Sequence, residues 1–159
     1  MTLNPELVHA TAIALNGRGI LLAGKSGSGK SDLAIRLIDR GAKLVCDDYC
    51  DIIDGGDYPF IVAKPTIAGK IELRGVGILK LDYVEKAPLF VVFRLDQQPE
   101  RLPDSNKEMH VAGWSIPSFA IAPFENSAAL KVEYLIQQMI DAGRRPMRLV
   151  TPGYKRSAV

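Results

Sequence analysis

Apolar and polar positions follow two different periods along the chain. Short apolar runs with β-branched residues predict a set of strands: Val8–Leu15, Ile20–Ala23, Lys43–Cys46, Asp51–Ile53, Phe60–Ala63 and Leu89–Leu95. Two other segments repeat their apolar residues every three to four positions, which predicts helices over Ser31–Arg40 and Asn126–Ala142. Glu72–Leu81 is strand-like at its end, Trp114–Pro123 is extended, and Gln97–Lys107 is a polar loop.

Turn residues connect these elements into an order. Asn16-Gly17 predicts a tight hairpin between the first two strands, and Gly55-Gly56 predicts a second hairpin. Gly41 is placed to end the first helix. Because the opening hairpin is antiparallel, the sequence predicts an α/β fold with a mixed sheet and flanking helices.

Composition limits the class of protein. The chain has 159 residues, 47% hydrophobic and 24% charged, which fits one soluble domain. A net charge of +2 gives no reason to expect a nucleic acid or membrane partner, and no apolar run approaches the roughly 20 residues that cross a bilayer. The N-terminus lacks the layout of a signal peptide, so we expect a cytoplasmic protein. We divide it into a domain over residues 1–143 and a basic tail, without acidic residues, over 144–159.

The two cysteines, Cys46 and Cys50, lie close together in the sequence, and neither histidine is near them. A structural zinc ion takes four nitrogen or sulfur ligands, so zinc is not expected. A cytoplasmic protein keeps its thiols reduced, and we therefore expect both cysteines to be free thiols that pack in the core.

The segment Gly24–Ser31 reads GKSGSGKS and satisfies the phosphate-loop pattern G-x-x-x-x-G-K-[ST]. Its glycines allow conformations in which successive N–H groups point at phosphate oxygens; the loop residues before the helix are Gly24, Lys25, Ser26, Gly27, Ser28 and Gly29. The following helix adds the positive end of its dipole. Lys30 is expected to bind the β- and γ-phosphates, and Ser31 to offer its hydroxyl to Mg²⁺. The flanking strand and helix support a nucleoside triphosphate site.

Acidic and basic residues elsewhere complete a candidate site. Asp47 and Asp48 follow a predicted strand, so one carboxylate can reach Mg²⁺ while the other faces a phosphoryl acceptor as a general base. An acidic turn without a catalytic role is the alternative. Glu72 and Arg74 lie on the same side of an extended segment, and their spacing fits an active-site pair and a surface ion pair equally well. His9, taken alone, fits an ordinary surface or core histidine.

In their order along the chain, His9, Gly24–Ser31, Asp47-Asp48 and Glu72–Gly77 (ELRGVG) resemble the catalytic domain of the HPr kinase/phosphorylase family. That family phosphorylates a serine of the phosphocarrier protein HPr and can remove the phosphate with inorganic phosphate. The resemblance implies a P-loop kinase-like fold, ATP and Mg²⁺ as cofactors, HPr as partner and a homo-oligomer, typically a hexamer. The chain looks like a short form consisting of the C-terminal catalytic domain.

The resemblance also implies roles for single residues. Asp47 matches the general base toward the serine, while Asp48, with Ser31 and Glu72, matches the metal side. His9, Arg74 and Arg101 match further catalytic positions, Arg101 in a mobile loop. The segment 122–126 reads APFEN where the family has a basic, glycine-rich loop, which leaves the phosphorylase reaction open.

The sequence therefore predicts an ATP- and Mg²⁺-dependent protein serine kinase that acts on HPr in regulation of the phosphotransferase system. Two alternatives stay open at this point. One is a P-loop kinase of a small metabolite, and the other is a nucleotide-dependent regulatory module without catalysis.

Overall fold

The computed structural model describes residues 5–104 and 106–149. It contains two helices in this part of the chain, α1 (Lys30–Asp39) and α2 (Ala128–Asp141). The strands before the middle of the chain are β1 (Glu6–Val8), β2 (Ala10–Leu15), β3 (Arg18–Ala23), β4 (Lys43–Cys46), β5 (Cys50–Asp54) and β6 (Pro59–Val62). The later strands are β7 (Lys70–Leu73), β8 (Gly77–Lys80), β9 (Lys86–Arg94), β10 (Glu108–Val111), β11 (Trp114–Ala120) and β12 (Met147–Arg148).

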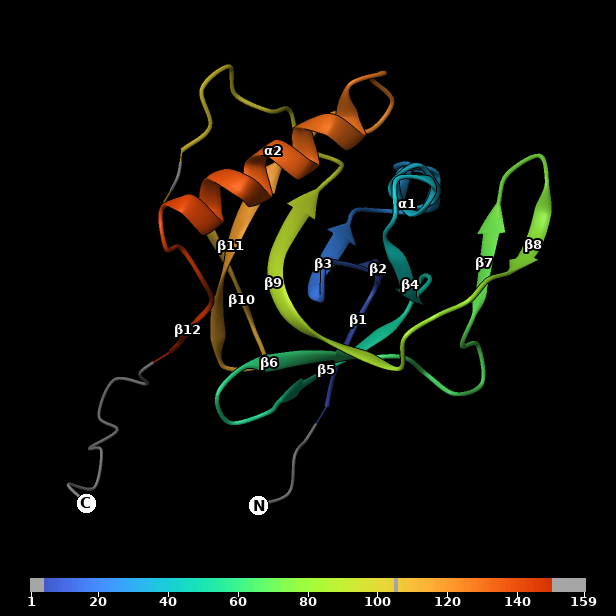
Figure 1. The fold of residues 1–159 in the computed structure, drawn as a ribbon, viewed down its shortest axis with the longest axis horizontal. Coiled ribbons are helices and arrows are strands. Elements are labelled where there is room, and N and C mark those ends of the chain that lie inside the picture. The colour runs from blue at the N-terminus through green and yellow to red at the C-terminus, as the bar shows by residue number, and fades with distance from the viewer. Residues whose placement is uncertain (1–4, 105, 150–159) are drawn as a thin grey trace.

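Most strands join one mixed sheet in the order β1-β5-β6-β9-β3-β2-β4, and β11 also pairs with β9 and carries β10 and β12. The pairs β3–β9 and β9–β11 are parallel, and the other pairs are antiparallel. The hairpin β7–β8 forms a separate two-stranded sheet that projects from one side of the domain (Figure 1). The predicted mixed α/β fold is confirmed.

Both faces of the central strands are buried, which explains their continuous apolar runs. Ile13, Leu22 and Phe93 pack with the apolar stripes of α1 and α2 in one cluster. Ala12, Leu21 and Val92, their neighbours in sequence, pack in a second cluster with β5, β6 and β11 residues. The alternation follows from the two-residue period of a strand. The helices therefore cover one face, while the curled sheet closes over the other.

The Asn-Gly signal has the geometry it predicts. Asn16 and Gly17 have φ angles of 50° and 78°, and Leu15 pairs directly with Arg18. Two consecutive residues in the left-handed region form the turn that matches strand twist. The antiparallel β2–β3 hairpin thereby delivers β3 to the start of the phosphate loop.

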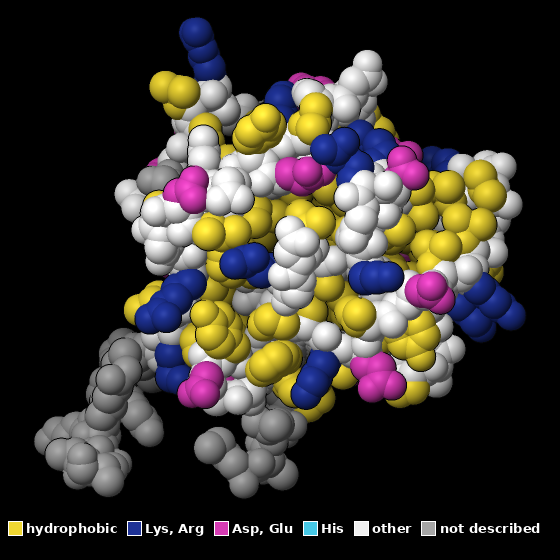
Figure 2. All heavy atoms as spheres, viewed as in Figure 1, with side chains coloured by type: hydrophobic (Ala, Val, Ile, Leu, Met, Phe, Trp, Pro, Cys, Tyr) yellow, Lys and Arg dark blue, Asp and Glu magenta, His cyan; other side chains and the backbone are white. Residues whose placement is uncertain are grey.

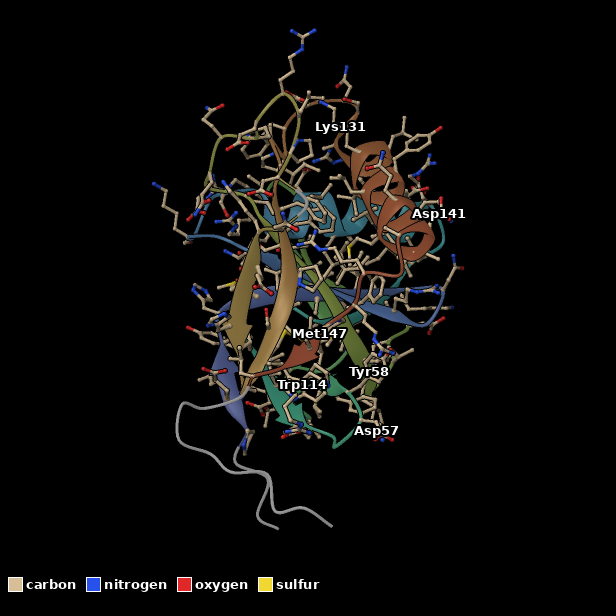
Figure 3. The ribbon with its side chains drawn as sticks, turned by 90° about the vertical axis from the view of Figure 1, so that its left-hand side faces the viewer. Asp57, Tyr58, Trp114, Lys131, Asp141 and Met147 are labelled. Carbon is tan, nitrogen blue, oxygen red and sulfur yellow. A yellow bond between two sulfur atoms is a disulfide. The ribbon has the colours of Figure 1, made fainter. Side chains whose placement is uncertain are left out.

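The opening strand and the tail differ from the sequence predictions. The predicted strand over Val8–Leu15 is broken at His9, which lies between β1 and β2. The first residues of the expected tail belong to the sheet, because Met147–Arg148 forms β12 against β11. Figure 3 shows Met147 beside Trp114 of β11, near the β5–β6 turn that carries Asp57 and Tyr58. Residues 150–159 of the tail lie outside the described residues.

The expectation of free thiols is wrong. Cys46, the last residue of β4, and Cys50, the first residue of β5, form a disulfide with a Cα–Cα distance of 5.9 Å. Both are buried as expected, so they do pack in the core. Four positions of separation and a turn between two strands bring the sulfur atoms together, and the bond encloses the acidic pair Asp47-Asp48.

Candidate active site

The phosphate loop connects β3 to α1. Gly27 and Gly29 have φ angles of 83° and 97°, a region that costs any residue with a Cβ more than glycine. Lys30 is only 5% exposed, and its Nζ donates hydrogen bonds to the carbonyls of Gly24 at 2.8 Å and Lys25 at 3.1 Å. The lysine therefore folds back over the loop, where its charge is placed to meet an anion that the loop amides could hold.

Asp47 accepts hydrogen bonds from three other elements. Its Oδ1 accepts from the hydroxyl of Ser31 at 2.9 Å and from the hydroxyl of Thr11 at 2.8 Å. Its Oδ2 accepts from the backbone N–H of Glu72 at 3.0 Å. Asp47 is 7% exposed, and these donors offset the cost of burying its charge. Asp47 thus joins α1, β2 and β7 at the loop.

Asp48 lies in a different environment. It is exposed, and its φ of 65° is rare for a residue other than glycine. Its backbone N–H approaches the hydroxyl of Thr11 at 3.4 Å, and its Oδ1 lies 3.9 Å from Nε2 of His9. The ring of His9 stacks on Tyr49, with centroids 5.0 Å apart. The turn therefore holds one aspartate inward and turns the other to solvent beside His9.

A cavity of about 490 Å³ lies over the phosphate loop. Its lining combines loop residues with both aspartates and a few further side chains: Ser26, Gly27, Gly29, Lys30, Ser31, Asp32, Asp47, Asp48, Glu72, Leu73, Arg74 and Phe124. The cavity thus brings together part of the loop, the aspartates that follow β4, and Glu72 and Arg74. The loop residues Gly24, Lys25 and Ser28, which the sequence also singled out, do not line it. His9 is adjacent through Asp48. Arg101 is exposed in the segment between β9 and β10 and does not line the cavity.

A magnesium ion at this site would be bound partly by protein side chains and partly by phosphate oxygens of the substrate. Within residues 5–104 and 106–149, no group of three or more His, Cys, Asp or Glu side chains is arranged to hold a metal ion by itself. Mg²⁺ commonly uses only one or two carboxylates together with substrate phosphates. The Ser31 hydroxyl and the Asp47 carboxylate, 2.9 Å apart at the cavity wall, fit that pattern.

A second cavity, of about 660 Å³, lies away from the phosphate loop. Arg18, Arg144 and Arg145 line it together with Tyr58 and other aromatic and aliphatic residues. Figure 2 shows hydrophobic side chains interspersed with Lys and Arg on the face that this view presents. No residue that the sequence assigned to the site lies in this cavity.

Among the described helices, none is long and apolar enough to cross a membrane.

Sequence reasoning missed two residues of the site. Thr11 is fully buried and contacts both aspartates, and the signal for it was present, because it is the only polar residue of β2. Phe124 lines the cavity from the segment before α2, where the sequence offered only a departure from a family pattern. The signal at Thr11 marks a polar residue in an apolar strand, but the contacts of Thr11 and Phe124 join distant segments, and local patterns do not encode such contacts.

Comparison with solved structures supports the fold. The structure of the Hpr(Ser) kinase/phosphatase from Coxiella burnetii aligns with a TM-score of 0.75 at 23% identity, over 87% of this chain and 98% of that chain. At this identity the match establishes the architecture.

Comparison of sequences gives the family. A protein of Clostridium beijerinckii named HPr kinase/phosphorylase is 33% identical over 144 residues, which cover 80% of this chain and 47% of the relative. One of the same name from Burkholderia lata is 32% identical over 126 residues, 72% of this chain and 39% of the relative. The chain thus spans less than half the length of these relatives. The profile described as HPr Serine kinase C-terminal domain matches residues 2–86, more than half of the chain, and the chain belongs to that family.

Proposed function

We propose that this domain is an ATP- and Mg²⁺-dependent kinase that phosphorylates a serine of the phosphocarrier protein HPr. The observation that carries the proposal is the cavity in which the phosphate loop, the Asp47-Asp48 pair and the Glu72–Arg74 segment meet. Family membership and the names of the relatives supply the acceptor. A hexameric assembly, which the resemblance implies, and a cytoplasmic location, which we expect from the N-terminal sequence, stay predictions.

The loop and its lysine would hold the triphosphate. Amides of Gly24–Gly29 and the N-terminus of α1 point positive partial charge at the phosphates, and Lys30 adds a full charge. Arg74, exposed on the cavity wall, is placed to balance negative charge as the phosphoryl group moves. Phosphoryl transfer depends mainly on such positioning and charge stabilisation.

One of the two aspartates would bind Mg²⁺, and the other would act as the general base. The resemblance implies Asp47 as general base and Asp48 as metal ligand, but the contacts favour the opposite division. Asp47 accepts a hydrogen bond from the hydroxyl of Ser31, and its two oxygens accept from three donors in all. In phosphate-loop enzymes, the serine or threonine of the loop and one aspartate hold Mg²⁺ together. Asp48 is exposed at the cavity and lies near His9. We therefore propose Ser31 and Asp47, supported by Glu72, as the Mg²⁺ side, and Asp48 as the base.

In this scheme Asp48 accepts the proton of the serine hydroxyl as its oxygen attacks the γ-phosphorus. The bond between the γ-phosphorus and the bridging oxygen breaks, and ADP leaves with the electron pair. Mg²⁺ would supply charge neutralisation at the β- and γ-phosphates. In phosphorolysis an oxygen of inorganic phosphate would attack the phosphorus of phosphoserine, the bond to the serine oxygen would break, Asp48 would return the proton to that oxygen, and pyrophosphate would leave. The segment 122–126 offers no basic side chain for the inorganic phosphate.

The test is incubation of the protein with HPr, ATP and Mg²⁺, followed by mass analysis of the phosphorylated residue. We expect one phosphoserine on HPr, absent when Lys30→Ala protein is used. A panel of small metabolites with a hydroxyl group forms the second arm of the experiment. Transfer to a metabolite and not to HPr would reject the proposed acceptor, and ATP binding without transfer to any acceptor would reject the proposed catalysis.

A further inference from the structure

Phe124 is the one aromatic side chain among the described residues that line the cavity over the phosphate loop. It is 70% exposed. Single exposed hydrophobic residues are common on protein surfaces, so exposure by itself indicates no role. Its position is more informative, because the ring touches the loop itself. A Cβ at Gly29 would lie 3.0 Å from Cζ and 3.1 Å from Cε1 of Phe124, so the loop covers one corner of the ring and leaves most of its surface open.

The ring comes from a different segment of the chain than the acidic residues of the cavity. In Figure 1, α1 stands between the β7–β8 hairpin on one side and the segment that leads into α2 on the other. Asp47 and Glu72 come from β4 and β7, whereas Phe124 comes from the segment before α2. The phosphoryl acceptor has to meet the terminal phosphate near the acidic residues. The rest of the nucleotide then extends away from the acidic residues, and the segment before α2 supplies another part of the cavity lining through Phe124.

The segment that carries Phe124 is held in place by α1. Arg36 of α1 donates hydrogen bonds to the backbone carbonyls of both neighbours of Phe124, to Pro123 and, at 3.1 Å, to Glu125. Asp32, one turn earlier in α1, pairs with the same guanidinium at 2.9 Å. Because the helix that begins at the phosphate loop also fixes this segment, ring and loop form one unit. A preorganised contact of this kind loses little conformational entropy when a ligand binds.

We propose that Phe124 is the platform on which the base of the nucleotide stacks. The inference rests on the proposed nucleotide-binding function and adds the place of the base to it. Every nucleobase has a π-face, so stacking on an aromatic side chain adds affinity with little selection between bases. Phe124 is therefore expected to favour ATP and GTP alike over a triphosphate chain without a base. It is a binding residue that does not touch the reacting atoms.

The experiment compares ligands that carry a base with a ligand that has none. Binding of ATP, of GTP and of inorganic tripolyphosphate, each with Mg²⁺, is measured by calorimetry for the unaltered protein and for Phe124→Ala. Loss of one stacked base weakens binding by about 5- to 150-fold. We expect such a loss for ATP and for GTP, with the affinity for tripolyphosphate unchanged within about twofold. Tyr134→Ala is the matched control, because Tyr134 is also 70% exposed and lies on α2 outside the cavity.

A second variant reports on the contact directly. Phe124→Trp keeps an aromatic face, so it should retain most of the ATP affinity, and ATP but not tripolyphosphate should quench the added fluorescence. The native Trp114 is buried and outside the cavity, so it contributes a constant background. Phe124→Leu keeps apolar bulk without a π-face and should behave like Phe124→Ala.

Other outcomes separate this inference from the proposed function. Unchanged ATP affinity in Phe124→Ala would overturn the base platform while leaving the nucleotide site standing. Equal losses for ATP and tripolyphosphate would overturn it too, because Phe124 would then only shape the loop. A change in HPr binding or in oligomeric state, with nucleotide affinity intact, would assign the ring to a protein contact instead. If the unaltered protein bound neither ligand, the proposed function itself would fail.

Discussion

The hydroxyl of Ser31 donates a hydrogen bond to Oδ1 of Asp47, 2.9 Å away, and so links the phosphate loop to the end of β4. Sixteen positions of sequence separate the two residues. Only the pairing of β4 with β2, next to β3, brings them together. The link ties the residue that would meet Mg²⁺ to the buried carboxylate of Asp47, and it gives Asp47 an environment different from that of its exposed neighbour Asp48.

The first prediction separates the two aspartates. Asp47→Asn should raise the Mg²⁺ concentration needed for half-maximal activity by about 10- to 100-fold, because a group that orients or binds the metal is lost. Asp48→Asn should leave that concentration unchanged and lower kcat by about 10²- to 10⁴-fold, as loss of a general base does. Both follow from magnesium titrations of HPr phosphorylation. Asp141→Asn, on α2 and outside the cavity, is the control.

The result would contradict our assignment if the two phenotypes were exchanged. An Asp47→Asn protein with an unchanged magnesium requirement and a collapsed kcat would restore the division that the family resemblance implies.

The second prediction concerns Thr11, a positioning residue. Its buried hydroxyl donates to Asp47 at 2.8 Å and accepts from the N–H of Asp48 at 3.4 Å. Thr11→Val keeps the shape but removes both contacts, and leaves a buried carboxylate with one donor fewer, at a cost of about 1–3 kcal/mol in unfolding free energy. Thr11→Ser keeps the hydroxyl and should rescue the magnesium dependence. Urea unfolding and magnesium titration measure the two effects. Equal behaviour of Val and Ser variants would show that the hydroxyl does not position Asp47.

Local sequence patterns were sufficient to predict turns, buried strands and amphipathic helices. Asn16-Gly17, the apolar run of β9 and the stripe of α1 all formed as predicted. β10 was missed because three of its four residues are exposed, so it shows no apolar pattern. β12 was missed because its two residues are held by partners far away in sequence.

For the candidate site, too, the sequence identified the residues that belong to local motifs and missed those that depend on tertiary contacts. Part of the loop pattern and the first half of the ELRGVG segment line one cavity, while Gly24, Lys25, Ser28 and Gly75–Gly77 do not. The roles of these residues stay predictions. The sequence analysis did not identify Thr11 and Phe124, because each reaches the site only through the tertiary arrangement. The state of Cys46 and Cys50 escaped because a general expectation about compartments replaced an argument from their spacing, which allows a bridge across the turn.

The third prediction uses the disulfide between Cys46 and Cys50. Closing so short a loop restricts the unfolded chain by about 2 kcal/mol in the chain-entropy treatment. Reduction, or the double change Cys46→Ala and Cys50→Ala, should lower the unfolding free energy by about that amount. Because the bond encloses Asp47 and Asp48, HPr phosphorylation should also fall at temperatures where the protein remains folded. Denaturant unfolding and activity with and without dithiothreitol, with thiols counted by mass, provide the measurement.

The double variant is also the control, since its activity should not respond to dithiothreitol. Full activity of the reduced, folded protein would show that the turn holds both aspartates without help from the sulfur bridge.

The fourth prediction is a pH dependence of stability that comes from Asp54. Arg148 of β12 donates two hydrogen bonds to this carboxylate, at 2.6 and 3.0 Å, and one at 2.5 Å to the carbonyl of Gly56. The hydrogen bonds from Arg148 lower the pKa of Asp54 from its ordinary 3.8 to about 2, against an opposing effect of burial. The pair fastens the end of the chain that the structure describes to the β5–β6 hairpin.

Because the pKa is lower in the folded state, the stabilisation is fully present above pH of about 4 and is lost as the pH falls toward 2. The carboxylate is one-third exposed, so screening by solvent reduces the contribution to about 1 kcal/mol. Asp54→Asn should therefore lower the unfolding free energy by about that amount at pH 7 and by almost nothing at pH 2. Urea unfolding followed by fluorescence of Trp114, whose ring lies 4.6 Å from the Arg148 guanidinium, reports on this region.

Asp57→Asn, at an exposed position in the same turn, should have no such effect. An Asp54→Asn penalty of equal size at both pH values would mean that the side chain acts through shape and neutral hydrogen bonds, and that its charge contributes nothing.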